Sequence, residues 1–331
     1  MLDITQALQN AIDSVGSAGG GDCVFAGQGL ISSNVTVRAG VTLKGVNPTK
    51  GGVNRDSAGS VNPATMPTAF TVSTAINGPA FITEQNSAIR RVAMVAQNFP
   101  FQYTATPTFA GVACGNLASS ATPLFDVLVE DSQFYGFVTA VRTDWLSRVN
   151  VNRCNMECIE AVEISNAYDV CKISECEAWP FMAAGSLSGS SILKNGTAFF
   201  LHDNNSSWHV IEDCFAYGWA TAFGLENTGN DRLINCGADG PGGVTATGIS
   251  IYGRSYGAAL VTGFQSAVST GINSNATTAD WGVTAQVTNA QFWGNVQNPF
   301  NVQANNTVKG YNVFWTGGSN VVGSGSTLTL V

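Results

Sequence analysis

Charged side chains are scarce in this chain of 331 residues, of which they make up 11%. An average soluble domain has about 25%. The 14 lysines and arginines form no cluster, and the formal net charge is -8. Because nucleic-acid binding requires grouped basic side chains that neutralise phosphates, we expect no nucleic-acid partner. A helical bundle is also disfavoured, since it would need more Glu, Lys, Leu and Arg.

Long apolar runs are missing as well. None approaches the roughly 18 residues of a membrane span, so we expect no such span. The N-terminus has no basic stretch followed by an apolar core, which disfavours a secretory signal peptide. Two interpretations stay open: the protein is made in a cytoplasm, or sequence is missing upstream.

The eight cysteines lack the close spacing of a zinc ribbon or knuckle. Cys154 and Cys158 have three residues between them, and Cys171 and Cys176 have four. Four of the eight occupy one column of the repeat described next. Free cysteine is among the most buried residue types. We therefore expect a stack of reduced thiols in the core, with no metal or other cofactor.

A repeat with a period of 22 residues organises the stretch from Val127 to Gly240. In each copy an aliphatic residue precedes a small one by three positions, and the small residues are Ser132, Cys154, Cys176, Cys214 and Cys236. The larger gap after Cys176 contains an insertion loop, placed at about 181–196. Short alternating segments that recur at this period are typical of a solenoid, whose coils pair as parallel strands about 4.8 Å apart. The prediction is an all-β fold, a single-stranded parallel β-helix.

One helix is expected before the coils. Asp3 and Gln6 have the spacing of a capping box, with Asp3 as the N-cap and Gln6 at N3, and a glycine run at 19–21 ends the helix. Such a helix can cover the open edge of the first coil. We therefore expect a capping helix at 1–21 and a β-helix domain at 22–331. Within that domain the coils are most regular at 127–240 and looser at 241–331, without a separate C-terminal domain.

The opening of the chain carries a recognisable set of motifs. It consists of the helix sequence Asp3–Asp13, the glycines at 19–21 and the strand segment Val35–Gly45. These 45 or so residues resemble the opening of the pectate-lyase-like superfamily of right-handed parallel β-helices, which bacteriophage tailspikes and capsule depolymerases share. Two features depart from that pattern. The Gly- and Asp-rich strand before the helix is absent, and Ala26–Gly29 replaces the usual Pro-x-Gly.

The resemblance implies more than a fold. It implies a homotrimer of side-by-side β-helices, attached to a phage tail through a missing N-terminal module. The location implied is the virion, acting at the bacterial cell surface, or a secreted protein if the chain is not viral. Catalytic residues vary between tailspikes, so no residue role is transferred from the family.

Candidate functional residues are those that point away from the core. The small residues of the repeat are called the ladder positions. One or three residues after them, Trp179, Phe215 and Tyr217 are expected to form an exposed aromatic patch flanked by Glu157 and Glu177. Aromatic faces stack on sugar rings, and carboxylates accept hydrogen bonds from the hydroxyls. The alternative is a patch buried against another subunit, since exposed aromatic residues also mark interfaces.

Carboxylates recur one residue before the ladder positions. Glu175 and Asp213 fall on neighbouring coils, about 5 Å apart. Such a pair raises one pKa and keeps a proton available for general acid catalysis. The alternative is a solvated bend. Taking the outward positions together, we predict Glu177 and Asp213, beside Trp179 and Tyr217, as the first catalytic candidates.

A second outward column contains His202 and Glu226. Asp203 follows His202, and Glu226 lies one coil later, so Asp203 and Glu226 are the second catalytic candidates, with His202 as a binding residue. Neighbouring coils give the separation of about 5 Å found in retaining glycosidases, and two coils give about 9.5 Å, which suits inversion through a water. Both outcomes stay open.

Three hypotheses of function follow. The first is a tailspike-like endo-glycosidase that hydrolyses a bacterial surface polysaccharide (capsule, exopolysaccharide or lipopolysaccharide O-antigen) with paired carboxylates and without a metal. The second is a non-catalytic receptor-binding spike or adhesin with the same fold. The third is a polysaccharide lyase, which would need a basic catalyst and often calcium. Lys172 and Lys194 are isolated, and no Asp-rich calcium loop occurs.

Overall fold

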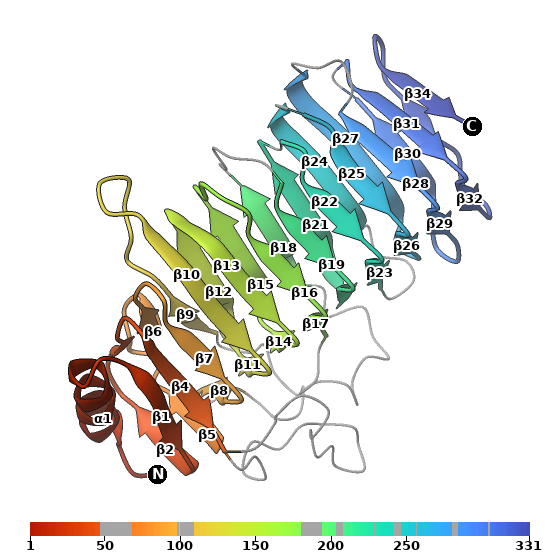
Figure 1. Ribbon diagram of the computed structural model, residues 1–331. Helices are drawn as coiled ribbons and strands as arrows, with labels where there is room; N and C mark the ends of the chain where they lie inside the picture. Colours follow the sequence, from red (N-terminus) through yellow and green to blue (C-terminus); the bar gives the residue numbers. More distant parts are fainter. Residues whose placement is uncertain are drawn as a thin grey trace. The chain divides into compact units, whose positions relative to one another are not determined.

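The protein is an all-β parallel β-helix with one short N-terminal helix (Figure 1). The computed structural model describes residues 1–46, 68–97, 99, 109–179, 194–202, 208–227, 229–240, 246–255, 257–279, 284–303 and 305–331. The chain forms two compact units: the first comprises Met1–Glu163 and Cys176–Ser188, and the second Ile164–Glu175 and Gly189–Val331. The predicted fold is confirmed.

Each coil of the first unit contributes one strand to each of three parallel sheets. The first sheet contains β1 (Gly21–Phe25), β4 (Val41–Gly45), β7 (Ala88–Arg90), β10 (Leu124–Glu130) and β13 (Leu146–Asn152). The second contains β2 (Gly27–Ile31), β5 (Thr68–Val72), β8 (Ala93–Ala96), β11 (Gln133–Tyr135), β14 (Asn155–Glu157) and β17 (Glu177–Ala178). The third contains β3 (Val35–Val37), β6 (Pro79–Thr83), β9 (Ala110–Gly115), β12 (Phe137–Asp144) and the first four residues of β15 (Glu160–Ser165).

The second unit repeats this arrangement. Its first sheet contains β16 (Lys172–Ser174), β19 (Val210–Glu212), β22 (Arg232–Ile234), β25 (Ala259–Thr262), β28 (Ala285–Thr288), β31 (Thr307–Tyr311) and β34 (Thr327–Leu330). The second contains β20 (Phe215–Tyr217), β23 (Gly237–Asp239), β26 (Gln265–Ser266), β29 (Gln291–Phe292) and β32 (Phe314–Trp315). The third contains β18 (Lys194–His202), β21 (Trp219–Glu226), β24 (Thr247–Ser255), β27 (Thr270–Ala279), β30 (Asn298–Val302) and β33 (Val321–Val322).

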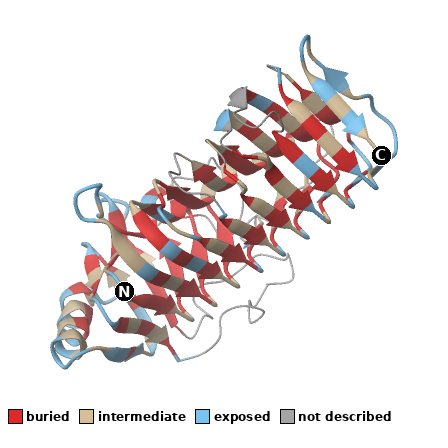
Figure 2. Ribbon diagram, turned by 45° about the horizontal axis from the view of Figure 1, so that its top comes forward, coloured by how far each residue is buried: buried red, intermediate tan, exposed pale blue. Residues whose placement is uncertain are grey.

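The strand register follows the 22-residue ladder. Val129 pairs with Val151 in the first unit, and Ile211 pairs with Leu233 in the second. Across the insertion, Ile173 pairs with Ile211. Buried residues (red in Figure 2) alternate with more exposed ones along many of the strands. The inward positions therefore form a continuous apolar core within each unit, as the period-2 pattern predicts.

The helix α1 (Thr5–Ser17) begins one residue later than a capping box would allow. Its N-cap is Ile4, which makes no side-chain cap bond, and Gln6 bonds to Asn10. The predicted capping box is therefore wrong, although the Asp3 carboxylate accepts hydrogen bonds from the N–H and the hydroxyl of Thr5, at 3.0 and 2.7 Å. The apolar face of α1 packs against β1, β3 and β4 and thus covers the first coil as expected. Among the described residues, no helix has the length and apolarity to cross a bilayer.

All eight cysteines are buried and free, as expected for a reduced core. In the first unit the Cys176 Sγ lies 3.6 Å from the carbonyl oxygen of Val151, one coil earlier, and in the second the Cys236 Sγ lies 3.5 Å from that of Ile211. Burial raises the pKa of the Cys236 thiol to about 12, so this thiol stays protonated at neutral pH. The ladder cysteines act as small apolar core residues.

From β7 onward, the described bends between the first and second sheets each contain one residue with left-handed backbone. In the first unit these residues are Arg91, Asp131 and Arg153, with φ of 57°, 52° and 49°. In the second unit they are Glu175, Asp213, Asn235, Gly263, Asn289 and Asn312, with φ between 51° and 69°. Glu175 and Asp213 are exposed bend residues, and their catalytic role stays a prediction.

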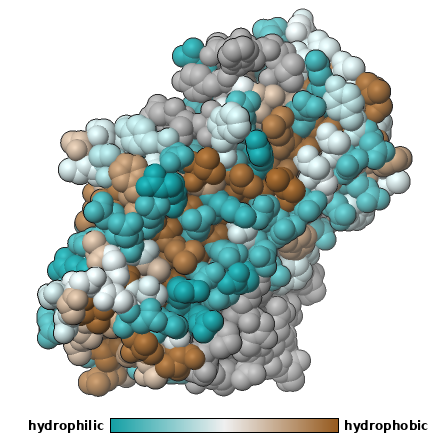
Figure 3. All heavy atoms as spheres, viewed as in Figure 1, coloured by the Kyte–Doolittle hydropathy of each residue, from teal (hydrophilic) through white to brown (hydrophobic). Residues whose placement is uncertain are grey.

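Polar side chains dominate much of the surface in spite of the low charge. In the view of Figure 3, hydrophilic side chains (teal) cover a large part of the face, with apolar ones (brown) between them. Since charged residues are 11% of the chain, much of this polar surface is contributed by Asn, Gln, Ser and Thr. Their uncharged hydrogen-bonding groups are available on outward strand positions.

Candidate functional site

Two glutamates on β15 form the most unusual polar site of the first unit. The carboxyl groups of Glu160 and Glu163 lie close enough to influence each other's titration. Glu160 is half-buried, whereas Glu163 is buried. Because two neighbouring carboxylates repel each other, one of the two carboxyl groups keeps its proton to a higher pH than an isolated glutamate does.

The surroundings of this pair decide which carboxyl group holds the proton. Burial, and then the negative charge of Glu163, raise the pKa of Glu160 above its ordinary value. The Thr139 hydroxyl donates to Glu160 Oε2 at 3.0 Å and lowers that pKa in part. The Arg142 Nε lies 3.3 Å from Glu163 Oε2 and stabilises Glu163 as the anion. The site therefore favours a protonated Glu160 beside an ionised Glu163.

The strands of the third sheet place these four side chains. Thr139 and Arg142 come from β12, and the two glutamates come from β15, which follows β12 in the order of the sheet. Arg142 is exposed, so the site opens to solvent on the Arg142 side. A proton donor at such an opening can act as a general acid. In the part of the chain that the structure describes, no group of three or more His, Cys, Asp or Glu residues has a geometry that could hold a metal ion.

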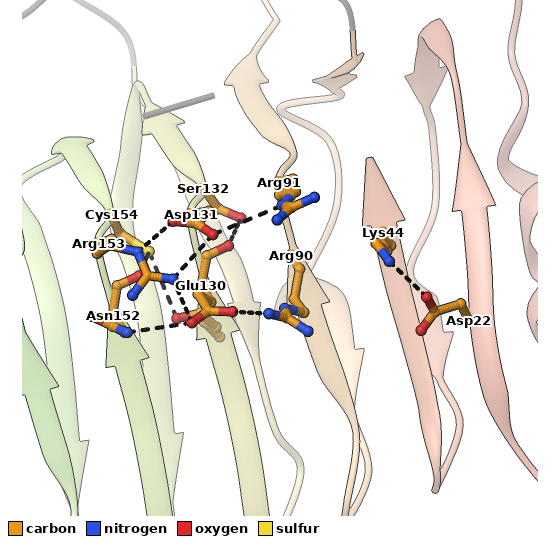
Figure 4. A network of polar contacts seen from close by, with 11 residues as sticks. Asp22, Lys44, Arg90, Arg91, Glu130, Asp131, Ser132, Asn152, Arg153 and Cys154 are labelled. Carbon is orange, nitrogen blue, oxygen red and sulfur yellow. Dashed lines mark hydrogen bonds and ion pairs between the residues drawn. The ribbon is translucent and has the colours of Figure 1, made fainter. Parts of the chain in front are cut away.

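Another charged cluster of the first unit lies on its first sheet and is shown in Figure 4. Glu130 bonds to Arg90 on one side and to Arg153 Nη2, at 2.6 Å, on the other. Arg153 Nε also donates to Asp131 Oδ1 at 2.7 Å. The Glu130 carboxylate is thus held by two guanidinium groups on neighbouring coils. We assign this cluster a structural role.

In the second unit, aromatic rings gather on the third sheet. The rings of Phe200 and His202 stack with centroids 4.3 Å apart and an interplanar angle of 22°. Phe200 also stacks with Tyr252 at 6.2 Å and 25°. Glu226 pairs with Tyr252 in the register, and all four residues are half-buried. This surface contains two of the residues predicted from the sequence, His202 and Glu226.

The ladder candidates of the first unit differ in their exposure. Glu177, on β17, is exposed, and Trp179 is half-buried. Glu157 is fully buried on β14, so the expectation that it flanks an exposed patch is wrong. Its neighbour in the register, Tyr135, is buried too, and the ring of Phe99 lies against the following Gly136. The outward positions at Tyr135 and Glu157 are therefore covered, whereas Glu177 on the next strand of the sheet is open to solvent.

The remaining candidates belong to the second unit or lie outside the described residues. Phe215 and Tyr217, on β20, are half-buried rather than exposed. Burial, with a smaller contribution from Asp239, raises the pKa of the Tyr217 hydroxyl. Asp213 is an exposed bend residue of the second unit, whereas Glu177 belongs to the first. Their pairing stays a prediction. Asp203 lies outside the described residues.

Glu160 was missed because outward columns follow every second residue of a strand. Glu160 and Glu163 are three apart on one strand, so they do not fall in one column. Glu160 also occupies the first position of β15, directly after a bend, where a strand pattern gives little guidance. The available signal was Glu-x-x-Glu at the start of an expected strand.

With the fold and these geometries described, solved structures provide the comparison. A tailspike protein of Acinetobacter baumannii bacteriophage Fri1, a capsular polysaccharide depolymerase, matches with a TM-score of 0.58 at 14% identity, over 98% of this chain and 60% of that one. A mutant tailspike protein of Escherichia coli bacteriophage HK620 in complex with a pentasaccharide matches with a TM-score of 0.60 at 12% identity, over 99% and 63%. An exopolygalacturonase from Thermotoga maritima matches with a TM-score of 0.55 at 9% identity, over 99% and 88%.

These likenesses show the fold: the chain has the architecture of phage tailspikes and of pectate-lyase-like parallel β-helix enzymes. The resemblance recognised in the sequence is confirmed at this level. The chain spans about three fifths of the length of the tailspikes that it matches. No family model matches the sequence, and no curated protein matches it either.

Proposed function

We propose that this chain is a tailspike-like protein that binds a bacterial surface polysaccharide and hydrolyses its glycosidic bonds. The fold supports a polysaccharide-acting protein, since the structural neighbours include a capsular polysaccharide depolymerase and an exopolygalacturonase. The observation that carries the proposal is the pair of neighbouring carboxyl groups of Glu160 and Glu163 beside Arg142. It supplies a carboxylic acid whose pKa is raised, so that it keeps its proton to a higher pH than an ordinary glutamate does.

In the proposed mechanism, Glu160 donates its proton to the glycosidic oxygen as the bond to the leaving sugar breaks. The negative charge of Glu163 holds the proton on Glu160 before the reaction and stabilises positive charge that develops on the sugar ring. Hydrolysis also needs a carboxylate on the other side of the ring, about 5 to 9.5 Å from the acid, to attack or to activate a water. Glu177, which belongs to the same unit, is the candidate for that role.

The test is an incubation of the protein with capsule and lipopolysaccharide preparations, with fragment size and reducing ends as the readout. Glu160→Gln and Glu163→Gln should each lower turnover by about 10²- to 10⁴-fold, as expected for loss of general acid catalysis. Glu177→Gln and Glu226→Gln, measured in the same assay, test the two carboxylates predicted from the sequence. Unchanged turnover in Glu160→Gln would remove this residue from the mechanism.

The same incubation distinguishes the alternatives. A product that absorbs as an unsaturated uronate would identify a lyase. Binding without fragments would identify a receptor-binding spike or adhesin. A trimer attached to a phage tail is part of the proposal, and measurement of the mass in solution tests the trimer directly. A monomeric mass for a protein of residues 1–331 would contradict self-assembly through these residues alone.

The pH dependence of turnover gives an independent readout. Activity should fall as the pH rises and Glu160 loses its proton. Thr139→Val removes a hydrogen bond that lowers the Glu160 pKa, so the alkaline limb of the profile should move to higher pH. Replacing Arg142 by Met removes a positive charge and should move that limb in the same direction. A limb that moves to lower pH in either variant would contradict the assignment of Glu160 as the acid.

A further inference from the structure

The aromatic rings on the third sheet of the second unit lie over a glycine. Phe200 pairs with Gly224 in the register, and Gly224 pairs with Ser250 on the next coil. A Cβ at position 224 would come within 3.0 Å of the Phe200 ring and 2.8 Å of Thr197 Cγ2. Because Gly224 has no side chain, the Phe200 ring can lie across β21 and reach the ring of Tyr252 on β24.

A ladder of uncharged polar side chains continues from this point along the same sheet. Ser250 pairs with Asn273, and Asn273 pairs with Asn301. The Asn301 Nδ2 donates to Asn273 Oδ1 at 2.9 Å, and Gln303 Nε2 donates to Asn301 Oδ1 at 2.9 Å. All four residues are half-buried. Since each amide has two N–H donors and two acceptor lone pairs, the ladder keeps further hydrogen-bonding capacity on its solvent side.

The two parts adjoin each other on one face. The ring cluster occupies β18 and β24, and the ladder occupies β24, β27 and β30. Neighbouring parallel strands lie about 4.8 Å apart, so polar groups recur at that interval along the direction in which the coils stack. A flat aromatic surface followed by regularly spaced hydroxyl and amide groups suits an extended chain of sugar rings.

The charge of this face restricts the ligand. Its ring cluster contains the carboxylate of Glu226, and the ladder residues are uncharged. The exposed Arg254 of β24 lies beyond the register shift that follows Gly253, after the positions that form the cluster and the ladder. An anionic sugar is normally bound by arginine or lysine, which pair with carboxylates through charged hydrogen bonds. A neutral glycan needs only ring stacking and uncharged hydrogen bonds, and both are present. The face is thus matched to a neutral segment and not to a polyuronate.

We infer that the third sheet of the second unit, from Phe200 to Gln303, binds an uncharged segment of the polysaccharide. This inference rests on the proposed function and names the class of glycan that the protein recognises. The cluster of Phe200, His202 and Tyr252 stacks on sugar rings, and the ladder of Ser250, Asn273, Asn301 and Gln303 binds sugar hydroxyl and N-acetyl groups. Glu226 accepts hydrogen bonds from hydroxyl groups at the ring cluster.

The test uses an array of purified bacterial polysaccharides of known composition, with neutral and uronate-containing repeats, together with alginate and polygalacturonate. The full chain with Glu163→Gln keeps glycans intact during the binding measurement. We expect binding to neutral polysaccharides, and a reduction of about tenfold or more when Phe200→Ala, Tyr252→Ala or Asn273→Ala is added. Asn312→Ala is the matched control, since Asn312 is an exposed amide of the same unit on a different face, and it should bind as the parent does.

Several outcomes would overturn the inference. They are binding to uronates only, no binding to any polysaccharide of the array, or neutral binding that Phe200→Ala and Asn273→Ala leave unchanged. A change of mass in solution on Phe200→Ala, without loss of binding, would instead show a contact between copies of the chain. The proposed function is judged separately. With Glu163 intact, Phe200→Ala should raise KM and leave kcat within a few-fold, so fragments at saturating substrate support hydrolysis whether or not the inference holds.

Discussion

The outward faces of the two units carry different chemistry on the same backbone. In the first unit, charged side chains stack from coil to coil, as in the series Arg90, Glu130 and Arg153. In the second unit, amides stack instead, as in Asn273 with Asn301 and Asn289 with Asn312. The apolar core and the parallel strand pairing are formed alike in both units, so the outward side chains vary without a change of fold. The difference teaches that surface chemistry on this solenoid is set coil by coil.

The bends show the same contrast. Left-handed backbone costs about 1–2 kcal/mol for most residues, whereas Asn and Gly adopt it readily. The first two bends of the second unit contain Glu175 and Asp213, but its later coils use Asn235, Gly263 and Asn289, which keeps the local strain low there. The first unit places Asp131 and Arg153 at its bends, and these two residues pair with each other at 2.7 Å. Ion pairing between successive bends therefore offsets backbone strain in the first unit.

The largest expected effect on stability is the removal of Glu130 from the first unit. Its side chain is 11% exposed and contacts two arginines that are each about one third exposed. Breaking such a pair leaves the guanidinium groups poorly compensated. We expect Glu130→Ala to lower the free energy of unfolding by about 2–3 kcal/mol, less than for a fully buried pair because solvent screens the arginines. Denaturant unfolding, combined with hydrogen exchange of residues 124–152, measures this.

Salt provides the control for Glu130→Ala. Screening weakens the wild-type cluster, so the difference between the variant and the wild type should shrink from about 0.01 M to about 1 M salt. The free energy of unfolding of the isosteric variant Glu130→Gln should lie between those of the wild type and of Glu130→Ala. A loss that is the same at both salt concentrations would mean that packing, and not charge, stabilises these coils.

The second unit contains a buried carboxylate with a different environment, Asp231. Its hydrogen bonds come from the backbone N–H groups of His209 and Gly229, and burial raises its pKa to about 7. The folded protein therefore binds a proton here that the unfolded chain releases near pH 4. This contribution to stability is fully present at low pH and is lost as the pH rises toward 7. Asp231→Asn should raise the free energy of unfolding above pH 7 by about 2 kcal/mol.

The comparison of pH profiles tests this prediction. Wild-type stability should decline between pH 4 and pH 7 more steeply than that of Asp231→Asn, because only the wild type titrates at this position. Glu212→Gln, at a half-buried position of the same unit that pairs with Lys172 at 2.5 Å, is the control and should keep the wild-type slope. Parallel profiles for the wild type and Asp231→Asn would contradict a raised pKa.

The fold was predictable because it depends on spacing alone. Cys154, Cys176, Cys214 and Cys236 recur at one height of the repeat, and a small inward residue at a fixed period is sufficient to define stacked coils. The sites depend on contacts that spacing does not reveal. The Glu160–Glu163 pair needs two carboxyl groups from one strand to turn toward each other, and Phe200 reaches Tyr252 only because Gly224 has no side chain. Glu157 is buried, as is its register neighbour Tyr135, although Glu177 on the next strand of the same sheet is exposed.

A smaller effect is expected at the glycine of the second unit's bend column. Gly263 has φ of +69°, and a Cβ there would lie 2.5 Å from the Asn235 Oδ1 of the preceding coil. Gly263→Ala should lower the free energy of unfolding by about 1–2 kcal/mol, from backbone strain and from displacement of the amide. Adding Asn235→Gly removes the steric part and should restore some of the loss. If Gly263→Ala alone were as stable as the wild type, low backbone strain at the bends would not be a difference between the second unit and the first.

The smallest expected effect is at the amide ladder, and it completes the comparison of the two units. Asn301 is half-buried and bonds to Asn273 and Gln303, so Asn301→Ala should cost only about 0.5–1 kcal/mol, the net value of neutral hydrogen bonds that water can replace. In contrast to Glu130→Ala, this difference should be the same at about 0.01 M and about 1 M salt, since neutral amides are not screened. Hydrogen exchange of residues 298–303 in both salts measures it. A salt-dependent loss would show that charges also control the amide face, which would remove the basis for matching that face to a neutral glycan.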